Sequence, residues 1–488
     1  MVVTPGLRPA LGVASECAPL VKTGGLADVA GALPAALARQ GWGLRTLIPG
    51  YPGVLAALPR AREVAQVPDM FGGPARVLAS HAAGLDLLVL DAPHLFDRPG
   101  TPYWDASGRD WPDNDARFAA LSWMAARIAG GGLAGWRPEV VHLHDWQAGL
   151  AAVYLRELAT GVPCLMTVHN MAFHGLTGAG RLMALRLPDH GFHPEGFEFF
   201  GHINALKAGL VWADAVSTVS PTYARELMRP EFGMGLDGVV RARAADMSGI
   251  LNGIDTEVWN PATDPHLARP FTTPRGKAAN RRALLAEFAL TDGGGPVCAV
   301  VSRLSEQKGL DLLLQAAPVL TDRGGRLILL GAGDRGLENA WLAAASDGVA
   351  VRIGYDEGLS HRIYAGADAI LVPSRFEPCG LTQLYALRYG AVPVVALTGG
   401  LADTVIDANE AALRAGVATG LTVHPLSAET LAHALQRLCD LYADAPVWSR
   451  LRANGMKAPV GWEASAPAYG ALYSRLAQAA RARDTAAP

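Results

Sequence analysis

The stretch Pro-Ser-Arg-Phe-Glu-Pro-Cys-Gly-Leu-Thr-Gln, residues 373–383, decides the fold class of this chain. It follows the apolar run 369–372, and a helical pattern begins near Gly380. A short buried strand that enters a Pro/Gly turn and then a helix is the repeating unit of a parallel α/β sheet. The start of such a helix offers backbone N–H groups to a ligand.

Two side chains on this turn carry candidate chemistry. Glu377 lies just before the helix, where a carboxylate can accept hydrogen bonds from sugar hydroxyls. The alternative is a carboxylate that complements the helix dipole. Cys379 is interpreted as a packed thiol and not as a nucleophile, because no histidine is near it in sequence.

Short apolar runs alternate with longer helical stretches on both sides of this turn, which predicts an α/β protein with doubly wound parallel sheets. The expected strands are 11–15, 44–48, 87–90, 140–144, 165–169, 215–219, 297–302, 327–330, 349–353, 369–372 and 392–396. The expected helices are 27–40, 114–130, 147–159, 203–213, 309–320, 336–345, 380–390, 428–443 and 466–482. An irregular stretch at 251–264 is the expected hinge, so the predicted domains are 1–250, 251–459 and 460–488.

Composition excludes several classes of protein. The chain has 488 residues, of which 50% are hydrophobic and 18% are charged, with a net charge of −3. This is a globular protein of more than one domain without a basic field for nucleic acid or an anionic membrane. Five scattered cysteines without a CxxC pair argue against a disulfide framework or a zinc knuckle. With no signal peptide or membrane span in the pattern, a cytoplasmic protein is expected.

A second turn, Lys-Thr-Gly-Gly-Leu-Ala-Asp at 22–28, follows the first expected strand. Gly24 and Gly25 let the backbone approach a ligand closely, and the helix that follows offers N–H groups for a phosphate. Lys22 before the glycines and Asp28 after them favour a functional loop. A plain strand–helix turn is the alternative.

Ser-Arg-Leu-Ser-Glu-Gln-Lys-Gly at 302–309 follows the first expected strand of the second half. Arg303 and Lys308 are predicted to project over the same edge of the sheet. Preorganised cations at that edge stabilise a departing diphosphate. A pair of solvated surface cations is the alternative.

His-Leu-His-Asp-Trp at 142–146 ends another expected strand. Its two histidines share a strand face and are a possible metal pair, but no full ligand set is visible and no metal site is predicted. Asp145 and Trp146 are interpreted as sugar contacts, with the carboxylate for hydroxyls and the indole face for a ring. Thr-Val-His-Asn at 167–170 ends the next strand and adds polar groups to the same edge.

One motif favours a rival function. Gly-Ala-Gly-Asp-Arg-Gly at 331–336 matches the G-x-G-x-x-G pattern of dinucleotide-binding turns, and Asp356 lies 20 residues beyond it. The rival is an NAD-dependent oxidoreductase. Because the match lies deep in the chain and leaves the other motifs unexplained, an ordinary turn in a nucleotide-binding-like second domain is favoured.

Taken together, these segments resemble bacterial glycogen synthases and plant starch synthases, glycosyltransferase family 5. The matching segments, in the family's order, are 22–29, 98–114, 144–146, 167–170, 220–226, 232–238, 250–261, 302–311, 373–390 and 398–405. The resemblance implies a GT-B architecture of two Rossmann-like domains across a cleft, with 460–488 crossing back to the N-terminal domain. It implies transfer of glucose from ADP-glucose to the non-reducing end of an α-1,4-glucan (glycogen) with retention of configuration, without a metal or cofactor.

The resemblance also implies roles for individual residues. The implied catalytic residues are Glu377, His169, Arg303 and Lys308. The implied donor-binding residues are Lys22, Gly24, Gly25, Asn252, Arg303, Lys308, Tyr355, Glu377, Gly380, Leu381 and Thr382. The implied acceptor-binding residues are Asp28, Tyr103, Asp145 and Trp146. Tyr355 is the candidate platform for the adenine.

Retention through a nucleophilic carboxylate needs a second carboxylate about 5 Å away, and no such pair can be placed from the sequence. We expect instead a front-face substitution, in which the leaving phosphate oxygen takes the proton of the acceptor hydroxyl. Domain closure is expected to bring Lys22 to Arg303 and Lys308 and to exclude water. A non-catalytic glucan-binding module is a further alternative. The residues alone do not decide whether the donor is ADP-glucose or UDP-glucose. They also do not decide the oligomeric state.

Overall fold

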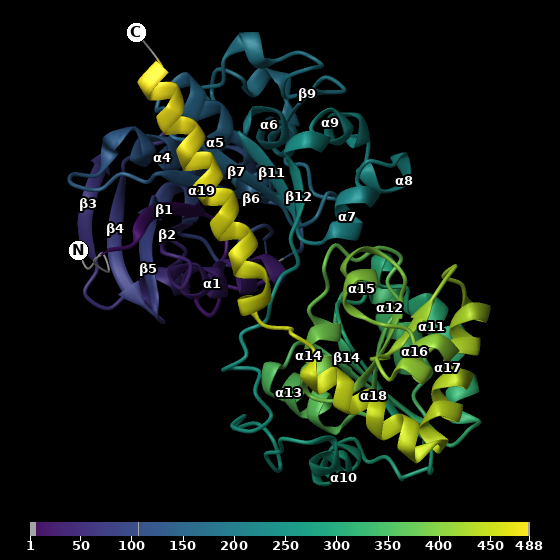
Figure 1. Ribbon diagram of the computed structural model, residues 1–488. Helices are drawn as coiled ribbons and strands as arrows, with labels where there is room; N and C mark the ends of the chain where they lie inside the picture. Colours follow the sequence, from purple (N-terminus) through teal and green to yellow (C-terminus); the bar gives the residue numbers. More distant parts are fainter. Residues whose placement is uncertain (1–5, 106, 487–488) are drawn as a thin grey trace. The chain divides into compact units, whose positions relative to one another are not determined.

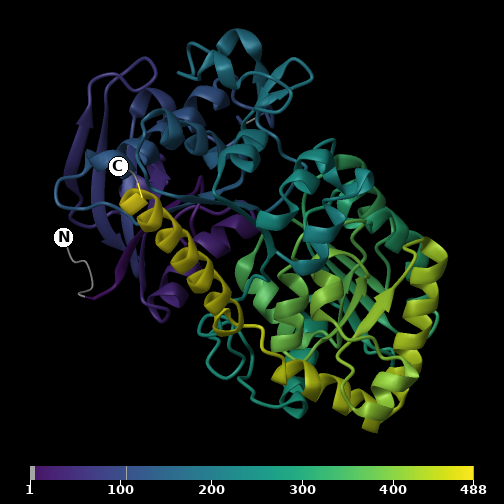
Figure 2. The same ribbon diagram turned by 45° about the horizontal axis from the view of Figure 1, so that its top comes forward.

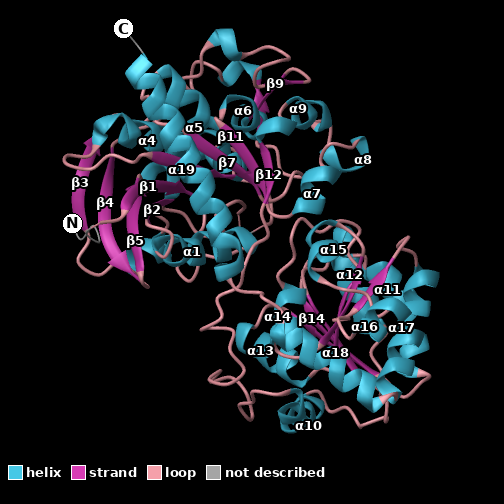
Figure 3. Cartoon of the chain, viewed as in Figure 1, coloured by secondary structure: helices cyan, strands magenta, loops and turns pink. Residues whose placement is uncertain are grey.

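The computed structural model describes residues 6–105 and 107–486. They form two compact units (Figure 1): unit 1 contains the residues up to Asn252 and those from Ser465 on, and unit 2 contains Gly253–Ala464. Helices flank the sheet of each unit (Figure 3). The predicted α/β class with two Rossmann-like units is confirmed.

Unit 1 is built on a nine-stranded sheet in the order β12-β11-β7-β6-β1-β2-β5-β4-β3. Neighbours from β12 to β5 pair in parallel, whereas β4 pairs antiparallel with both β5 and β3. A small antiparallel sheet has the order β8-β10-β9. The strands are β1 (Arg8–Val13), β2 (Trp42–Pro49), β3 (Arg62–Val67), β4 (Ala75–Ala82), β5 (Leu85–Asp91), β6 (Val140–His144), β7 (Cys164–Val168), β8 (Leu176–Gly178), β9 (Glu198–Phe199), β10 (His202–Asn204), β11 (Ala215–Thr218) and β12 (Met247–Gly249).

The helices of unit 1 include one from the C-terminal end of the chain. They are α1 (Gly25–Ala38), α2 (Pro52–Ala56), α3 (Pro93–Phe96), α4 (Asn114–Arg127), α5 (Asp145–Glu157), α6 (Ala205–Trp212), α7 (Pro221–Glu226), α8 (Pro230–Gly233), α9 (Asp237–Ala242) and α19 (Trp462–Ala486). Figures 1 and 2 both show α19 lying along unit 1.

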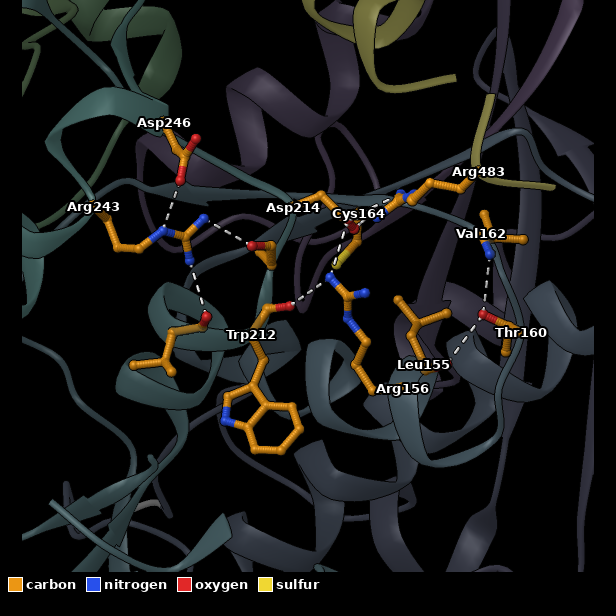
Figure 4. Close-up of polar contacts among 12 residues, drawn as sticks. Leu155, Arg156, Thr160, Val162, Cys164, Trp212, Asp214, Arg243, Asp246 and Arg483 are labelled. Carbon is orange, nitrogen blue, oxygen red and sulfur yellow. Dashed lines mark hydrogen bonds and ion pairs between the residues drawn. The ribbon is translucent and has the colours of Figure 1, made fainter. Parts of the chain in front are cut away.

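Helix α19 is attached to unit 1 by a buried aromatic contact and by ion pairs. The ring of Tyr473 packs edge-on against Trp42, with 5.2 Å between centroids. At its end, Arg483 pairs with Asp214 at 3.2 Å (Figure 4). The carboxylate of Asp214 also binds Arg156 and accepts a hydrogen bond from the backbone N–H of Cys164. One carboxylate therefore joins α19, α5 and the start of β7.

Unit 2 contains a six-stranded parallel sheet in the order β15-β14-β13-β16-β17-β18. Its strands are β13 (Val297–Val301), β14 (Arg326–Gly331), β15 (Val349–Ile353), β16 (Ala369–Val372), β17 (Val392–Ala396) and β18 (Leu421–Val423). Its helices are α10 (Ala278–Glu287), α11 (Leu310–Thr321), α12 (Arg335–Ala343), α13 (Glu357–Gly366), α14 (Thr382–Arg388), α15 (Gly399–Thr404), α16 (Glu410–Ala415), α17 (Ala428–Ala443) and α18 (Ala445–Lys457).

The core of unit 2 lies on both faces of this sheet. Alternate residues of β13 contribute to two separate apolar clusters: Val297 and Ala299 to one, Cys298 and Val300 to the other. Successive side chains of a strand point to opposite faces, so a strand covered on both sides has no polar position. This is why β13, β16 and β17 read as continuous apolar runs.

The order of strands creates a switch point in each sheet. In unit 2 the chain leaves β13 toward β14 on one side, and β16 begins the other side. In unit 1 the chain leaves β1 toward β2, and β6 lies on its other side. Open α/β sheets bind ligands in the crevice at such points, beyond the carboxyl ends of the strands. The motif-bearing loops after β13, β16, β1 and β6 all begin there.

Candidate active site

The loop after β16 in unit 2 is shaped by close backbone approaches that only glycine allows. Gly380 has a φ of +73°, in the left-handed region. A Cβ on Gly399 would lie 1.9 Å from the carbonyl oxygen of Glu377, and one on Gly309 would lie 2.0 Å from that of Pro373. The start of α11, the turn after β16 and the start of α15 can therefore meet at the carboxyl edge of the sheet.

The carboxylate of Glu377 is buried at this turn. Its Oε2 lies 2.6 Å from Lys308 Nζ and accepts a hydrogen bond from Ser374 Oγ at 2.7 Å. The side chains of Lys308 and Glu377 are only 17% and 10% exposed. The pair joins the loops after β13 and β16, so the structure brings these two predicted residues together. A charge-assisted hydrogen bond in so dry a place is strong and directional.

The same two loops are joined a second time by the side chain of Arg375. Its guanidinium binds both carboxylate oxygens of Asp311, at 2.8 and 2.7 Å. Its backbone N–H donates to Gln307 O, and Gln307 Nε2 donates to Phe376 O. Arg375 is therefore committed to holding the loops together, and Lys308 and Arg303 remain the predicted diphosphate-binding cations of this edge.

The other predicted donor-site residues of unit 2 lie on the segments that follow β13, β15 and β16. Arg303 is exposed, and its side chain forms no hydrogen bond or ion pair with the residues that the structure describes. Leu381 and Thr382 stand at the start of α14, which has no side-chain cap. The ring of Tyr355 is 73% exposed just after β15, and its hydroxyl donates to Glu357 at 2.7 Å.

Gln383 supports the turn through its side-chain amide, a role that the sequence pattern did not indicate. The side chain is fully buried, and its Nε2 donates to the carbonyl oxygens of Cys379 and Gly380 at 3.0 and 2.9 Å. It also lies 3.2 Å from Thr404 Oγ1. Because these carbonyls are bound from inside, the backbone of the turn is fixed before a ligand arrives.

The glycines of 331–336 have a packing explanation. A Cβ on Gly331 would lie 1.9 Å from Ser302 O, and one on Gly333 would lie 2.1 Å from Leu304 O. Asp334 caps α12 by accepting from Leu337 N. The G-x-G-x-x-G pattern thus lets β14 pass close to the loop after β13, and this removes the observation that favoured a dinucleotide site.

In unit 1 the loop after β1 is organised by Glu16, which sequence analysis missed. Its carboxylate, 3% exposed, accepts from the backbone N–H of Thr23 at 2.5 Å and from that of Gly24 at 3.3 Å. It also accepts from the hydroxyl of Tyr103 at 2.9 Å. Burial raises the pKa of Glu16 above its usual range. The sequence signal that could have found Glu16 is its position as an acidic residue directly after the first expected strand.

These contacts decide what Tyr103, Gly24 and Lys22 do in this structure. The hydroxyl of Tyr103 points inward to Glu16, and the N–H of Gly24, the N-cap of α1, is already bound. Gly25 begins α1. Lys22 Nζ lies 2.7 Å from Asp28 Oδ1, and both side chains are partly exposed. The loop is thus held by Glu16, with the Lys22–Asp28 pair at its surface.

A second cluster of polar side chains in unit 1 lies at the ends of β6 and β7. His144 Nδ1 lies 2.9 Å from His169 Nε2, and Asp145 Oδ1 accepts from the backbone N–H of His169 at 2.6 Å. Burial lowers the pKa of His144 to about 3 and that of His169 well below its usual range. Burial also raises the pKa of Asp145 to about 7. Both imidazoles are therefore neutral at pH 7.

Trp146 and Asn252 are the remaining predicted residues of unit 1. The indole of Trp146 packs edge-on against Phe118 at 5.0 Å, and a Cβ on Gly175 would lie 2.2 Å from Trp146 Cε3. Asn252 is buried, and its Oδ1 has no hydrogen-bond partner among the described residues. Polar groups of that kind are satisfied by water or by a ligand.

The described residues contain neither a metal-binding cluster nor a membrane-spanning helix. In residues 6–105 and 107–486, no three side chains of His, Cys, Asp or Glu are grouped so that they could hold a metal ion. Across the same ranges, no helix combines the length and apolar character needed to cross a bilayer.

Comparisons with known proteins cover nearly the whole chain. The model of the starch synthase catalytic domain matches residues 10–242, and that of glycosyl transferases group 1 matches residues 295–440. Glycogen synthase from Paracoccus denitrificans is 60% identical over 470 residues, which cover 96% of this chain and 99% of the relative. Glycogen synthase from Jannaschia sp. is 59% identical over 472 residues, with the same coverage of each chain.

Solved structures agree with these relatives. The catalytic domain of starch synthase IV from Arabidopsis thaliana, bound to ADP and acarbose, superposes with a TM-score of 0.88 at 31% identity and covers 97% of this chain and 100% of its own. Sucrose-phosphate synthase from Thermosynechococcus elongatus, at 21% identity and a TM-score of 0.60, shares the fold, and it too covers 97% of this chain and 100% of its own. Identity of this extent over nearly the full length of both chains shows that the chain belongs to the glycogen synthase and starch synthase family of glycosyltransferases.

Proposed function

We propose that this chain is a retaining glucosyltransferase that moves glucose from ADP-glucose to the non-reducing end of an α-1,4-glucan and releases ADP, the reaction that builds glycogen. The observation that carries the proposal is the buried Lys308–Glu377 pair at the switch point of unit 2. Relatives named glycogen synthase, and a similar starch synthase domain bound to ADP and acarbose, support the choice of donor and acceptor.

The geometry suits a front-face substitution. The acceptor hydroxyl oxygen forms a bond to C1 of the glucose, the bond from C1 to the diphosphate oxygen breaks, and the hydroxyl proton passes to that oxygen. Lys308 and Arg303 neutralise the charge that develops on the diphosphate. Glu377 already accepts two hydrogen bonds on Oε2, which weakens it as a nucleophile. We assign it to the hydroxyls of the transferred glucose, and His169 to the sugar beside the reacting carbon.

The partners in this proposal are ADP-glucose and the glucan, with no nucleic acid, membrane, metal or cofactor. All five cysteines are among the described residues, are buried and form no disulfide. Free thiols persist in a reducing compartment, which supports the cytoplasm as the place of action.

The test is a comparison of nucleotide release from ADP-glucose and from UDP-glucose, with glycogen as acceptor. We expect release of ADP together with incorporation of glucose, and a clear preference for ADP-glucose. Glycogen binding without release from either donor would identify a glucan-binding module instead. Tight binding of NAD without binding of ADP would favour the rival function, an NAD-dependent oxidoreductase.

A further inference from the structure

Two buried histidines in unit 1 have no part in the proposed chemistry. His142 is fully buried in β6, and His144, at the end of the same strand, is 2% exposed. A neutral imidazole has one donor and one acceptor nitrogen, so what each nitrogen contacts decides where the proton lies.

The contacts of His142 fix its ring at both nitrogens. Its Nδ1 lies 2.7 Å from the hydroxyl of Tyr473 in α19, and its Nε2 lies 2.6 Å from Thr167 Oγ1. Among the described residues, His142 is the one hydrogen-bond partner of the Tyr473 hydroxyl. Thr167 Oγ1 lies 2.6 Å from Ser217 Oγ. A relay of hydrogen bonds therefore connects α19 with the sheet.

The ring of His142 also supports that of His144. The two centroids are 4.1 Å apart with planes tilted by 36°, and the ring of Tyr469 in α19 packs against His142 with 5.7 Å between centroids. Because His142 is fixed at both nitrogens, it is a rigid surface against which the imidazole of His144 rests.

His144 in turn occupies one nitrogen of His169. Its Nδ1 shares a single proton with His169 Nε2 across 2.9 Å. The outer nitrogen of His169, Nδ1, must then play the opposite part to Nε2, as a donor if Nε2 accepts and as an acceptor if Nε2 donates. The backbone of His169 is held separately by Asp145. The side-chain direction of His169 therefore depends on His144.

We propose that His144 is a positioning residue that sets the rotamer and tautomer of His169, and that helix α19, through Tyr473 and His142, holds His144 in place. The inference rests on the proposed glucosyl transfer, in which His169 contacts the sugar. It gives the C-terminal helix a defined connection to the sugar-binding edge of unit 1.

The test compares three replacements of His144. Asparagine places an amide near the position of Nδ1, glutamine places it near that of Nε2, and leucine fills the space without a polar group. We expect His144→Asn to keep kcat within about threefold, and His144→Gln and His144→Leu to lower kcat by about tenfold to hundredfold, since small misplacements of a catalytic contact cost about that much. The affinity for ADP, measured by calorimetry, is expected to stay unchanged, because Arg303 and Lys308, which we assign to the diphosphate, lie in unit 2.

Two variants of α19 test the relay. Tyr473→Phe keeps the ring and loses the hydroxyl, and we expect kcat to fall at least about threefold. Tyr469→Phe, one turn earlier on the same helix, is the matched control and keeps kcat within about twofold. Thermal unfolding of every variant checks that the fold is intact.

Two sets of results would overturn the inference. Folded His144→Leu enzyme with wild-type kcat, or His144→Asn as impaired as His144→Leu, would leave His144 a packing residue. Equal effects of the two tyrosine variants on kcat would show that the Tyr473 hydroxyl does not link α19 to His144. Wild-type protein that releases no ADP would instead refute the proposed function itself, before any variant is compared.

Discussion

The replacement Lys308→Ala tests the centre of the proposed mechanism. It removes the ammonium that lies 2.6 Å from Glu377 Oε2, and among the described residues it leaves Ser374 as the side-chain partner of that carboxylate. It therefore affects the leaving group and the sugar contact together.

The kinetic magnitude follows from the position of the ammonium. Loss of one preorganised donor to a developing oxyanion costs about 2.7–4 kcal/mol, or about a hundredfold to a thousandfold in kcat. The effect on stability is smaller. Breaking a fully buried ion pair costs about 3–5 kcal/mol, but these side chains are 17% and 10% exposed and Ser374 remains, so we expect about 1–3 kcal/mol.

The assay is steady-state ADP release with saturating glycogen, with urea unfolding measured on the same preparations. Lys457→Ala is the control, because Lys457 is an exposed lysine at the end of α18 in the same unit. We expect it to match wild type in both measurements. A Lys308→Ala enzyme within about threefold of the wild-type kcat would refute the leaving-group role, whatever its stability.

Three further predictions follow from the same contacts. Gln383→Glu sets carboxylate oxygens against two carbonyls and is expected to raise the KM for ADP-glucose at least about tenfold and to cost about 1–3 kcal/mol of stability; an unchanged KM would contradict the support role. Burial raises the pKa of Asp145 to about 7, so the folded state holds a proton that the unfolded chain releases near pH 4, and stability falls between pH 4 and 7 by at most about 4 kcal/mol. In Asp145→Asn that fall is absent, and parallel stability curves for the two proteins in urea unfolding between pH 4 and 8 would show the shift to be wrong. Dialysis against EDTA is expected to leave kcat unchanged, because the proposed mechanism assigns the neutralisation of the diphosphate to Lys308 and Arg303; loss of activity that Mg²⁺ restores would contradict this.

The strands that are covered on both faces could be read directly from the chain. The expected runs 140–144, 369–372 and 392–396 coincide with the buried strands β6, β16 and β17, and 349–353 coincides with the edge strand β15, in which Arg352 is exposed. Continuous apolar residues bounded by turn residues leave few other structures for such segments.

The antiparallel edge of unit 1 was missed for a physical reason. Strand β4 has exposed Arg76 and His81 between buried residues, as strands with one wet face do, and β3 has a single buried residue, Val67. Which residues of such a segment are buried depends on the strands and helices that pack against it. The three-residue strand β18 was missed because it is too short to show any periodicity.

The sequence by itself determined the α/β class, the two sheets and the loops that carry the candidate chemistry, because the carboxyl ends of parallel strands must meet at one edge. Only the tertiary structure decided which groups touch there. Glu16 folds back onto the turn at Thr23, and Gln383 binds the carbonyls above it. Tyr473, from the far end of the chain, bonds to His142 in β6. Such contacts join residues far apart in the chain or depend on the direction of one side chain, and neither distance nor direction is encoded in local periodicity.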